Sequence, residues 1–269
     1  MAQIKYGFIG AGNMGGALAR AVRKAVPSGG QLIVADKAAA RAEGLARALD
    51  CKNGTNKDVA ANAEYIFLGV KPQMLRDLIE EIKPVLAVRN DRFLLVSMVA
   101  GVSIADLTAL FGAAYPVIRI MPNTPVAIGE GMIEYAVSDQ VFMDEISEFS
   151  EALRHAGKLD RLDENLINAA TAVAGSGPAF VYLFAEALAD GAVECGLPRA
   201  KAMEYAARTL RGAAEMILSS EKHPGELKDD VCSPGGTTIA GVHALENAGF
   251  RGAVMSAVTA AFEKSKKIE

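Results

Sequence analysis

The sequence is poor in cysteine and carries no excess of positive charge. Its three cysteines, Cys51, Cys195 and Cys232, leave one unpaired and lack the spacing of metal ligands. A secreted disulfide framework and a metal site are both disfavoured, and we expect a cytoplasmic protein. The 28 basic and 32 acidic side chains give a net charge of −4, with no basic cluster beyond a short C-terminal tail, which disfavours a nucleic-acid partner.

We also expect no targeting segment, and the sequence has no long uninterrupted hydrophobic run. The apolar stretch that opens the chain is far too short for the core of a signal peptide. One uncharged run, residues 169–185, is interrupted by Gly175-Ser176-Gly177-Pro178 and followed by Glu186 and Asp190. A helix packed on all sides explains this run better than a membrane span, so we expect no membrane partner.

Two domains are expected in a chain of 269 residues. From residue 4 to about 121, short runs rich in Val, Ile and Phe alternate with stretches of helical period, a pattern typical of βαβ units and a parallel sheet. The expected strands cover residues 4–10, 31–36, 65–70, 92–97 and 117–121, with 132–137 a weaker sixth. Most are apolar on both faces, as strands covered by helices on each side must be.

Beyond Asp139 the periods are helical only, over residues 141–156, 164–174, 178–195, 199–219 and 236–246, with a last helix ending at Lys266. The expected fold class is therefore α/β: an N-terminal Rossmann-type doubly wound sheet, residues 1–162, followed by an all-helical C-terminal oligomerisation domain, residues 163–269. The helix 178–195 is apolar over most of its circumference, and a second copy of the chain is its expected cover.

A glycine motif directly follows the first expected strand. It reads Gly10-Ala11-Gly12-Asn13-Met14-Gly15 and leads into a helical run. In such a motif the first glycine allows a tight turn, the second lets backbone approach a pyrophosphate, and the third lets helix and strand pack closely. The helix N-terminus offers free N–H groups and the positive end of its dipole to phosphates. A plain glycine turn is the alternative, but the strand–helix context favours dinucleotide binding.

The expected end of the second strand carries two residues with opposing implications for the cofactor. Asp36 could accept hydrogen bonds from an adenosine ribose, which favours NAD, whereas Lys37 could meet the additional phosphate of NADP. A solvated residue at the start of a helix is an equally good interpretation of Lys37, so the preference stays open.

Three further loops should face the cofactor, because ligands of doubly wound sheets bind at the C-terminal ends of the strands. They are residues 69–72, 97–101 and 121–125. Prolines such as Pro72 stiffen these loops, while Lys71, Asn123 and Thr124 bring a charge, an amide and a hydroxyl to the crevice. Ordinary loops that end strands would look similar.

A second informative segment, residues 230–239, places two glycines and three hydroxyl residues before a helix. Such a segment could present several N–H groups to a carboxylate, although an ordinary capped helix start is the simpler interpretation of the residues alone. The Gly175–Pro178 segment is also ambiguous, since it could serve only to let two helices cross closely.

Six strings together resemble the pyrroline-5-carboxylate reductases over essentially the whole chain. They are GFIGAGNMG at 7–15, VKP at 70–72, MPNTP at 121–125, GSGPAF at 175–180, HPGELKD at 223–229 and VCSPGGTTIAGVHALE at 231–246. The resemblance implies hydride transfer from NADP(H), with NAD(H) as the alternative, to the C=N bond of 1-pyrroline-5-carboxylate, giving L-proline. It also implies helical domains interlocked into dimers, often five dimers in a ring, with the active site between two chains.

The resemblance assigns roles residue by residue. Thr238 would hydrogen-bond the ring nitrogen as the catalytic residue, and the substrate side would comprise Glu164, Glu221, Ser233, Gly235, Gly236, Thr237 and Thr238. The cofactor side would comprise Gly10, Ala11, Gly12, Asn13, Met14, Gly15, Asp36, Lys37, Asn56, Val70, Lys71, Pro72, Ala100, Asn123 and Thr124. A protonated imine is already electrophilic, so this chemistry requires positioning and no catalytic histidine; His155, His223 and His243 are interpreted as structural.

Two rival functions remain. A β-hydroxyacid dehydrogenase would share the architecture, but its family carries a catalytic lysine a turn after a glycine motif, and residues 175–184 contain no lysine. A non-catalytic protein that binds the dinucleotide as a sensor predicts cofactor affinity without turnover.

Overall fold

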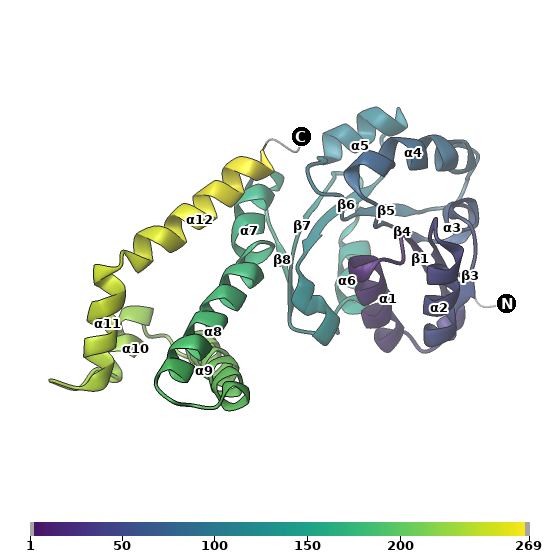
Figure 1. Ribbon diagram of the computed structural model, residues 1–269. Helices are drawn as coiled ribbons and strands as arrows, with labels where there is room; N and C mark the ends of the chain where they lie inside the picture. The colour runs from purple at the N-terminus through teal and green to yellow at the C-terminus, as the bar shows by residue number, and fades with distance from the viewer. Residues whose placement is uncertain (1–2, 267–269) are drawn as a thin grey trace. The chain divides into compact units, whose positions relative to one another are not determined.

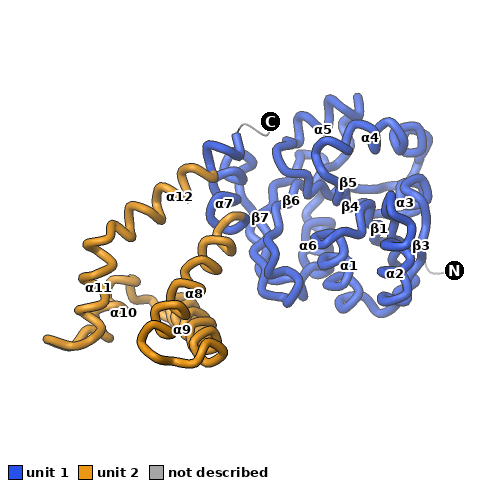
Figure 2. The backbone as a smooth tube through the Cα atoms, viewed as in Figure 1, with its two compact units in different colours: residues 1–175, 262–269 blue, residues 176–261 orange. Residues whose placement is uncertain are grey.

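The computed structural model describes residues 3–266 and divides into two compact units, residues 1–175 with 262–269, and residues 176–261 (Figure 2). We call them the sheet unit and the helical unit and describe each by itself. The boundary expected at residue 162 marks the last strand, which ends at Arg161, whereas the units part after Gly175.

The sheet unit contains an eight-stranded sheet in the order β3-β2-β1-β4-β5-β6-β7-β8 (Figure 1). The first six strands of the chain are parallel, while β7 pairs antiparallel to β6 and parallel to β8. The strands are β1 Tyr6–Ile9, β2 Leu32–Ala35, β3 Lys52–Asn53, β4 Tyr65–Leu68, β5 Leu94–Ser97, β6 Val117–Pro122, β7 Gly131–Val137 and β8 Gly157–Arg161.

Helices of the sheet unit connect these strands. They are α1 Asn13–Ala25, α2 Ala39–Leu49, α3 Asn56–Asn62, α4 Pro72–Ala87, α5 Ile104–Phe111, α6 Met143–Ala152 and α7 Ile167–Ala174, with short 3₁₀ turns η1 Gly29–Gln31, η2 Thr124–Ile128 and η3 Glu164–Leu166. The helical unit begins with α8 Gly177–Glu194 and continues with α9 Arg199–Ser219, α10 Pro224–Asp230, α11 Thr237–Asn247 and most of α12 Phe250–Ser265.

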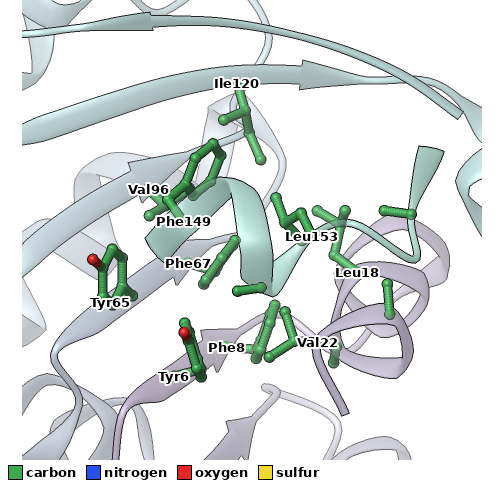
Figure 3. Close-up of a cluster of buried hydrophobic side chains, with 14 of the residues drawn as sticks. Tyr6, Phe8, Leu18, Val22, Tyr65, Phe67, Val96, Ile120, Phe149 and Leu153 are labelled. Carbon is green, nitrogen blue, oxygen red and sulfur yellow. The ribbon is translucent and has the colours of Figure 1, made fainter. Parts of the chain in front are cut away.

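The core of the sheet unit lies on both faces of the sheet. On one face Phe8 and Phe67 of neighbouring strands stack with ring centroids 4.4 Å apart, and Phe149 and Leu153 from the region of α6 lie over them (Figure 3). The other face carries Ile66 and Leu95 beneath α3, α4 and α5. Successive residues of the central strands β1, β2, β4 and β5 are buried, and they point alternately to the two faces, so both faces exclude water. The continuous hydrophobic runs expected of such strands are confirmed.

The expected fold class is confirmed, with one error in its detail. The expectation of helices only beyond Asp139 is wrong, because β8 forms at residues 157–161. This strand lies at the sheet edge, and its Lys158 and Arg161 are exposed, so it lacks the hydrophobic signal of a central strand. The two-residue edge strand β3 and the helix α10 were likewise not expected.

The helical stretch Glu164–Glu194 is long and apolar enough to cross a membrane by length and composition. One such stretch is a weak indication of a span, since helices that become buried pass the same test. Only about a tenth of its most apolar window is buried in the single chain.

Candidate functional site

The glycine turn between β1 and α1 has the close contacts that its sequence predicts. Gly10 has φ +108°, and a Cβ there would lie 2.4 Å from the Gly69 carbonyl oxygen at the end of β4. A Cβ on Gly15 would lie 2.0 Å from the Gly10 carbonyl oxygen. Any side chain at either position would force the turn, β4 and α1 apart.

Gly12 differs from these two glycines because it faces open space. A Cβ built on it meets nothing within 4 Å, and it caps α1 without a side-chain hydrogen bond. The first N–H groups of α1 therefore stay available to a ligand at the positive end of the helix dipole. This geometry fits a pyrophosphate.

A cavity of about 640 Å³ opens beside this turn at the C-terminal ends of β1, β2 and β4. It lies where the strand order reverses between β1 and β4, the position at which doubly wound sheets bind ligands. Its lining includes seven of the residues assigned to the cofactor from the sequence: Gly10, Gly12, Asp36, Lys37, Asn56, Val70 and Lys71. The size and location of the cavity suit one end of a dinucleotide.

Asp36 lies in this cavity wall with its carboxylate already engaged by the chain. Its Oδ2 accepts from the Ala11 N–H at 2.8 Å, and its Oδ1 accepts from the Ala38 N–H at 2.9 Å. The Arg41 guanidinium lies 3.4 Å from Oδ1. Asp36 thus ties the end of β2 to the glycine turn, and its negative charge is balanced by a cation.

Arg41 is a lining residue that the sequence reasoning missed. It lies in the first turns of α2, is exposed, and faces the same cavity as Lys37 and Lys71. A basic residue five positions after the acid that ends β2 is the signal that could have identified it. The cavity wall therefore carries three cations, and it also carries three carboxylates, Asp36, Asp77 and Glu81. The cations can contact a phosphate locally, but the wall has no net positive charge.

The remaining residues assigned to the cofactor lie around the cavity or away from it. Ala11 and Asn13 line a neighbouring hollow of about 770 Å³ that shares Gly12 and Arg41 with the first cavity. Met14 packs against the core and Gly15 is buried. Lys71 caps α4, with Pro72 as its first residue, and Asn56 donates from Nδ2 to Glu81 Oε2 at 2.8 Å.

The two later loops do not line that cavity. Asn123 is buried, and its amide is engaged at both ends: Nδ2 donates to the Ala174 carbonyl at 3.0 Å, and Oδ1 accepts from the Met132 N–H at 2.9 Å. Thr124 is exposed at the start of η2, and Ala100 is half-buried in the loop after β5. Asn123 thus holds the ends of α7 and β7 together.

In the helical unit, the segment assigned to the substrate forms the start of α11. A Cβ on Gly236 would lie 2.3 Å from Ser233 Oγ, so only glycine lets the serine hydroxyl approach the helix N-terminus. Thr237 and Thr238 are the first two residues of α11, and both are exposed. Their N–H groups precede the first helical hydrogen bonds and point to where a carboxylate could bind.

A hollow of about 500 Å³ borders this helix start and includes Gly235 and Gly236 in its wall. The same hollow is lined by His243 further along α11, whose Nε2 lies 3.0 Å from Asn247 Nδ2. Thr238 is not part of that wall. Glu221 is exposed in the segment that links α9 and α10.

His223 caps α10: its Nδ1 accepts from the Gly225 N–H at 3.0 Å. This contact agrees with the structural interpretation of that histidine. Within residues 3–266, no group of three or more His, Cys, Asp or Glu side chains could hold a metal ion.

Glu164, the first residue of η3, lies in the sheet unit. Its Oε1 accepts from the Ile104 N–H at 2.8 Å and from Arg119 Nη1 at 2.9 Å. Arg119 is a charged residue in the middle of β6 and is almost fully buried, with its side chain 4% exposed. The sequence reasoning missed it, although a single arginine inside the apolar run VIRIM was a visible signal.

Comparisons with known proteins agree along the chain. A family model described as pyrroline-5-carboxylate reductase dimerisation matches residues 164–268, and one described as NADP oxidoreductase, coenzyme F420-dependent, matches residues 5–101. A pyrroline-5-carboxylate reductase of Pisum sativum is 41% identical over 97% of this chain and 95% of its own length. One of Escherichia coli is 39% identical over 98% of each chain.

Solved structures give the same result. A Plasmodium falciparum pyrroline carboxylate reductase crystallised with NADP bound is similar to this chain with a TM-score of 0.88 and 32% identity, covering 100% of this chain and 99% of its own. A Coxiella burnetii pyrroline-5-carboxylate reductase is similar with a TM-score of 0.90 and 28% identity over 100% and 99%.

Proposed function

The chain belongs to the pyrroline-5-carboxylate reductase family, and from that premise we propose that it transfers a hydride from NADPH to the C=N bond of 1-pyrroline-5-carboxylate, forming L-proline in the last step of proline biosynthesis. The observation that carries the proposal is the cavity of about 640 Å³ beside the Gly10 turn, with Gly12 open to it and Lys37, Arg41 and Lys71 in its wall. Those features match a phosphate-bearing dinucleotide.

The cofactor-side roles assigned from the sequence stand as part of this proposal. The turn from Gly10 to Gly15 receives the pyrophosphate, and Asp36, Lys37, Asn56, Val70 and Lys71 surround the adenosine end. Pro72, Ala100, Asn123 and Thr124 belong to the same side in the family. For Asn123 the internal hydrogen bonds favour an indirect part, in which its amide holds the residue 121–125 loop in place.

NADPH is the cofactor that the cavity favours over NADH. Both Asp36 oxygens accept backbone N–H bonds, so this carboxylate has less capacity left for ribose hydroxyls. Lys37 and Arg41 remain in the wall as cations, and a guanidinium is well suited to bidentate contact with a phosphate. We therefore assign the additional phosphate of NADPH to these two side chains.

At the substrate, the proposed work of the chain is positioning. The first N–H groups of α11, with the hydroxyl of Ser233 and the backbone from Gly235 to Thr238, bind the substrate carboxylate. The Thr238 hydroxyl accepts a hydrogen bond from the protonated ring nitrogen, which keeps the imine electrophilic. Glu164 and Glu221 lie on the same substrate side by family resemblance.

When bound, the reduced nicotinamide supplies the hydride. The ring carbon of the C=N bond receives the hydride and the nitrogen keeps its proton, so the product is the secondary amine of proline. Holding the two carbons in contact supplies a large part of the acceleration, which explains why no strong acid is needed.

Assembly and location complete the proposal. The region 164–268 corresponds to the dimerisation region of the family, and α8 and α9 expose Tyr182, Leu183, Tyr205 and Leu218 in the single chain. We assign a second copy of the chain as their cover, with five dimers in a ring as the larger assembly, and we place the enzyme in the cytoplasm. We propose residues 1–162 and 163–269 as the functional domains.

The test is a steady-state assay of NADPH oxidation with 1-pyrroline-5-carboxylate, in which proline is identified by mass spectrometry. Thr238→Ala should lower turnover by on the order of 100-fold, as loss of a single well-placed hydrogen bond to the reacting group does. Thr238→Ser keeps the hydroxyl and should recover most of that rate.

Thr259→Ala is the matched control, because among residues 3–266 the hydrogen bond of the Thr259 hydroxyl stays within its own helix, where it donates to the Met255 carbonyl. It should retain the wild-type rate. Cofactor binding without proline formation by the wild-type chain would reject the proposed reaction, and a wild-type rate for Thr238→Ala would remove Thr238 from it.

A further inference from the structure

Arg119 is a buried cation with incomplete pairing. Its Nη1 donates to Glu164, whereas its Nε and Nη2 are buried without a hydrogen-bond partner among residues 3–266. Unsatisfied donors on a buried guanidinium are costly, and apolar side chains often replace buried ion pairs without loss of stability. Stability alone therefore gives no reason for an arginine at this position of β6.

Glu164 connects Arg119 to the start of α5 by hydrogen bonds. The same oxygen, Oε1, accepts from Arg119 and from the N–H of Ile104, the first residue of α5. A carboxylate at a helix N-terminus is stabilised by the helix dipole and by the free N–H groups there. Arg119 lies on strand β6, and its hydrogen bond to Glu164 fixes the position of that carboxylate.

The start of α5 is also where a loop from the cofactor edge ends. This loop, residues 98–103, leaves β5 after Ser97, which lies beside Arg119 in the parallel ladder. Its far end is held by a capping box in which Ser103 and Asp106 exchange hydrogen bonds. Hydrogen bonds from Ser103, and more weakly the charge of Arg119, lower the pKa of Asp106.

The near end of the loop borders the cavity. The Met98 N–H donates to the Leu68 carbonyl at 3.2 Å, and a Cβ on Gly69 would lie 3.4 Å from Met98 Sδ. Gly69 itself lines the cavity of about 640 Å³. A shift of α5 would therefore move this loop against the cavity wall.

We propose that Arg119 is a positioning residue of the reductase, which holds Glu164 against the start of α5 and so fixes the residue 98–103 loop at the edge of the cofactor cavity. This inference rests on the proposed function, because it takes NADPH as the occupant of the cavity. It gives the buried arginine a task that a neutral side chain of the same size could not perform.

The experiment measures NADPH binding to the full-length protein by fluorescence, without imine, together with hydrogen exchange of residues 98–104. Arg119→Met and Glu164→Gln should each raise the Kd for NADPH roughly tenfold, as loss of a hydrogen bond to a charged group does. The double variant should bind no more weakly than the weaker single variant, since both changes break the same connection. Exchange of the loop should rise in all three variants.

Arg119→Lys is the conservative variant and should recover part of the affinity lost in Arg119→Met, because it restores a cation beside Glu164. Should Arg119→Met fail to fold, the comparison of Arg119→Lys with the wild type carries the test. Arg92→Lys is the matched control: Arg92 pairs with Glu145 at 2.6 and 2.9 Å, beyond the opposite end of β5, and its variant should bind NADPH normally.

Three results would overturn the proposal: unchanged NADPH affinity in both Arg119 variants, additive losses in the double variant, or unchanged exchange of the loop. The proposed function fails separately, if the wild-type chain binds NADPH but makes no proline. A direct substrate role of Glu164 would appear as an additional rise in KM for the imine in Glu164→Gln alone, on top of the shared loss of cofactor affinity.

Discussion

The two units of this chain differ in how they exclude water. The sheet unit buries large aromatic and branched side chains on both faces of its sheet, including Phe8, Phe67 and Ile66. The buried cluster of the helical unit consists of three alanines, Ala189, Ala202 and Ala206. Small side chains supply little hydrophobic stabilisation, so most of the hydrophobic core of the single chain lies in the sheet unit, and we expect the helical unit to need a partner surface.

The largest effect should follow from weakening the core of the sheet unit. Phe8→Ala removes a fully buried ring that stacks on Phe67, and it should lower the free energy of unfolding by about 3–5 kcal/mol. Urea denaturation at fixed protein concentration measures the change. Phe142→Ala is the control, because Phe142 is 59% exposed and contacts mainly Arg92, and it should cost less than about 1 kcal/mol. Equal losses in the two variants would contradict the assignment of the core.

A second variant tests the helical unit. Leu183→Asp places a charge on α8, at a side chain 65% exposed in the single chain, and should weaken self-association more than about 100-fold, because burying an unpaired charge in an interface is costly. Sedimentation analysis measures the dimer fraction. The matched control is Val88→Asp in the sheet unit, an apolar side chain 76% exposed, which should associate normally. If Leu183→Asp associates like the wild type, this face of α8 is not an interface.

A third pair of variants, one in each unit, tests whether side chains of the sheet unit select NADPH over NADH. Arg41→Ala removes a cation from the cavity wall and should lower the preference for NADPH over NADH about tenfold, with little change in NADH binding. Initial rates with each cofactor on the same imine measure it. Arg211→Ala, an exposed arginine on α9, should leave the ratio unchanged. A ratio unaffected by Arg41→Ala would place the phosphate contact elsewhere.

The smallest expected effect concerns a buried carboxyl group of the sheet unit, that of Glu134. Burial, with Asp160 nearby, raises the pKa of Glu134, and its Oε2 is buried without a partner among residues 3–266. The folded state therefore holds this proton to higher pH than the unfolded state does, and stability falls as pH rises through that window. Glu134→Gln should be more stable than the wild type at pH 8 and equal to it at pH 4. Thermal denaturation at both pH values checks this, and the opposite sign would mean that the ionised carboxylate is favoured in the fold.

Central elements of the sheet unit could be predicted from the sequence, and edge elements could not. Strands such as β4 are apolar at every position because helices cover both faces, so their signal is strong. The edge strand β8 has exposed Lys158 and Arg161. It pairs with β7, from which helix α6 separates it in the sequence, and a local pattern does not record such a pairing. Helix α9 was predicted with its observed limits because the helix is long and its helical pattern is regular.

Part of the cavity lining could be named from the sequence, including Gly10, Asp36 and Lys71, but the contacts of these residues could not. The glycine motif located the turn, because a side chain at Gly10 or Gly15 would collide with neighbouring backbone, while Gly12 is open to a ligand. The sequence could not reveal that the Asp36 carboxylate accepts a hydrogen bond from the Ala11 N–H. Nor could it reveal that the Asn123 amide hydrogen-bonds the backbone of Ala174 and Met132. Such contacts depend on how distant segments meet. The ion pair of Arg119 could not be predicted for the same reason, since its partner Glu164 lies 45 residues further along the chain.

The two outer strands of the sheet have a consequence for how copies of the chain can meet. At one edge β3 is two residues long and exposes Lys52 and Asn53, and at the other β8 exposes Lys158 and Arg161. Short, charged borders resist the addition of a further strand from a neighbouring molecule. We therefore expect separated subunits to associate through their helices and not by pairing their sheet edges.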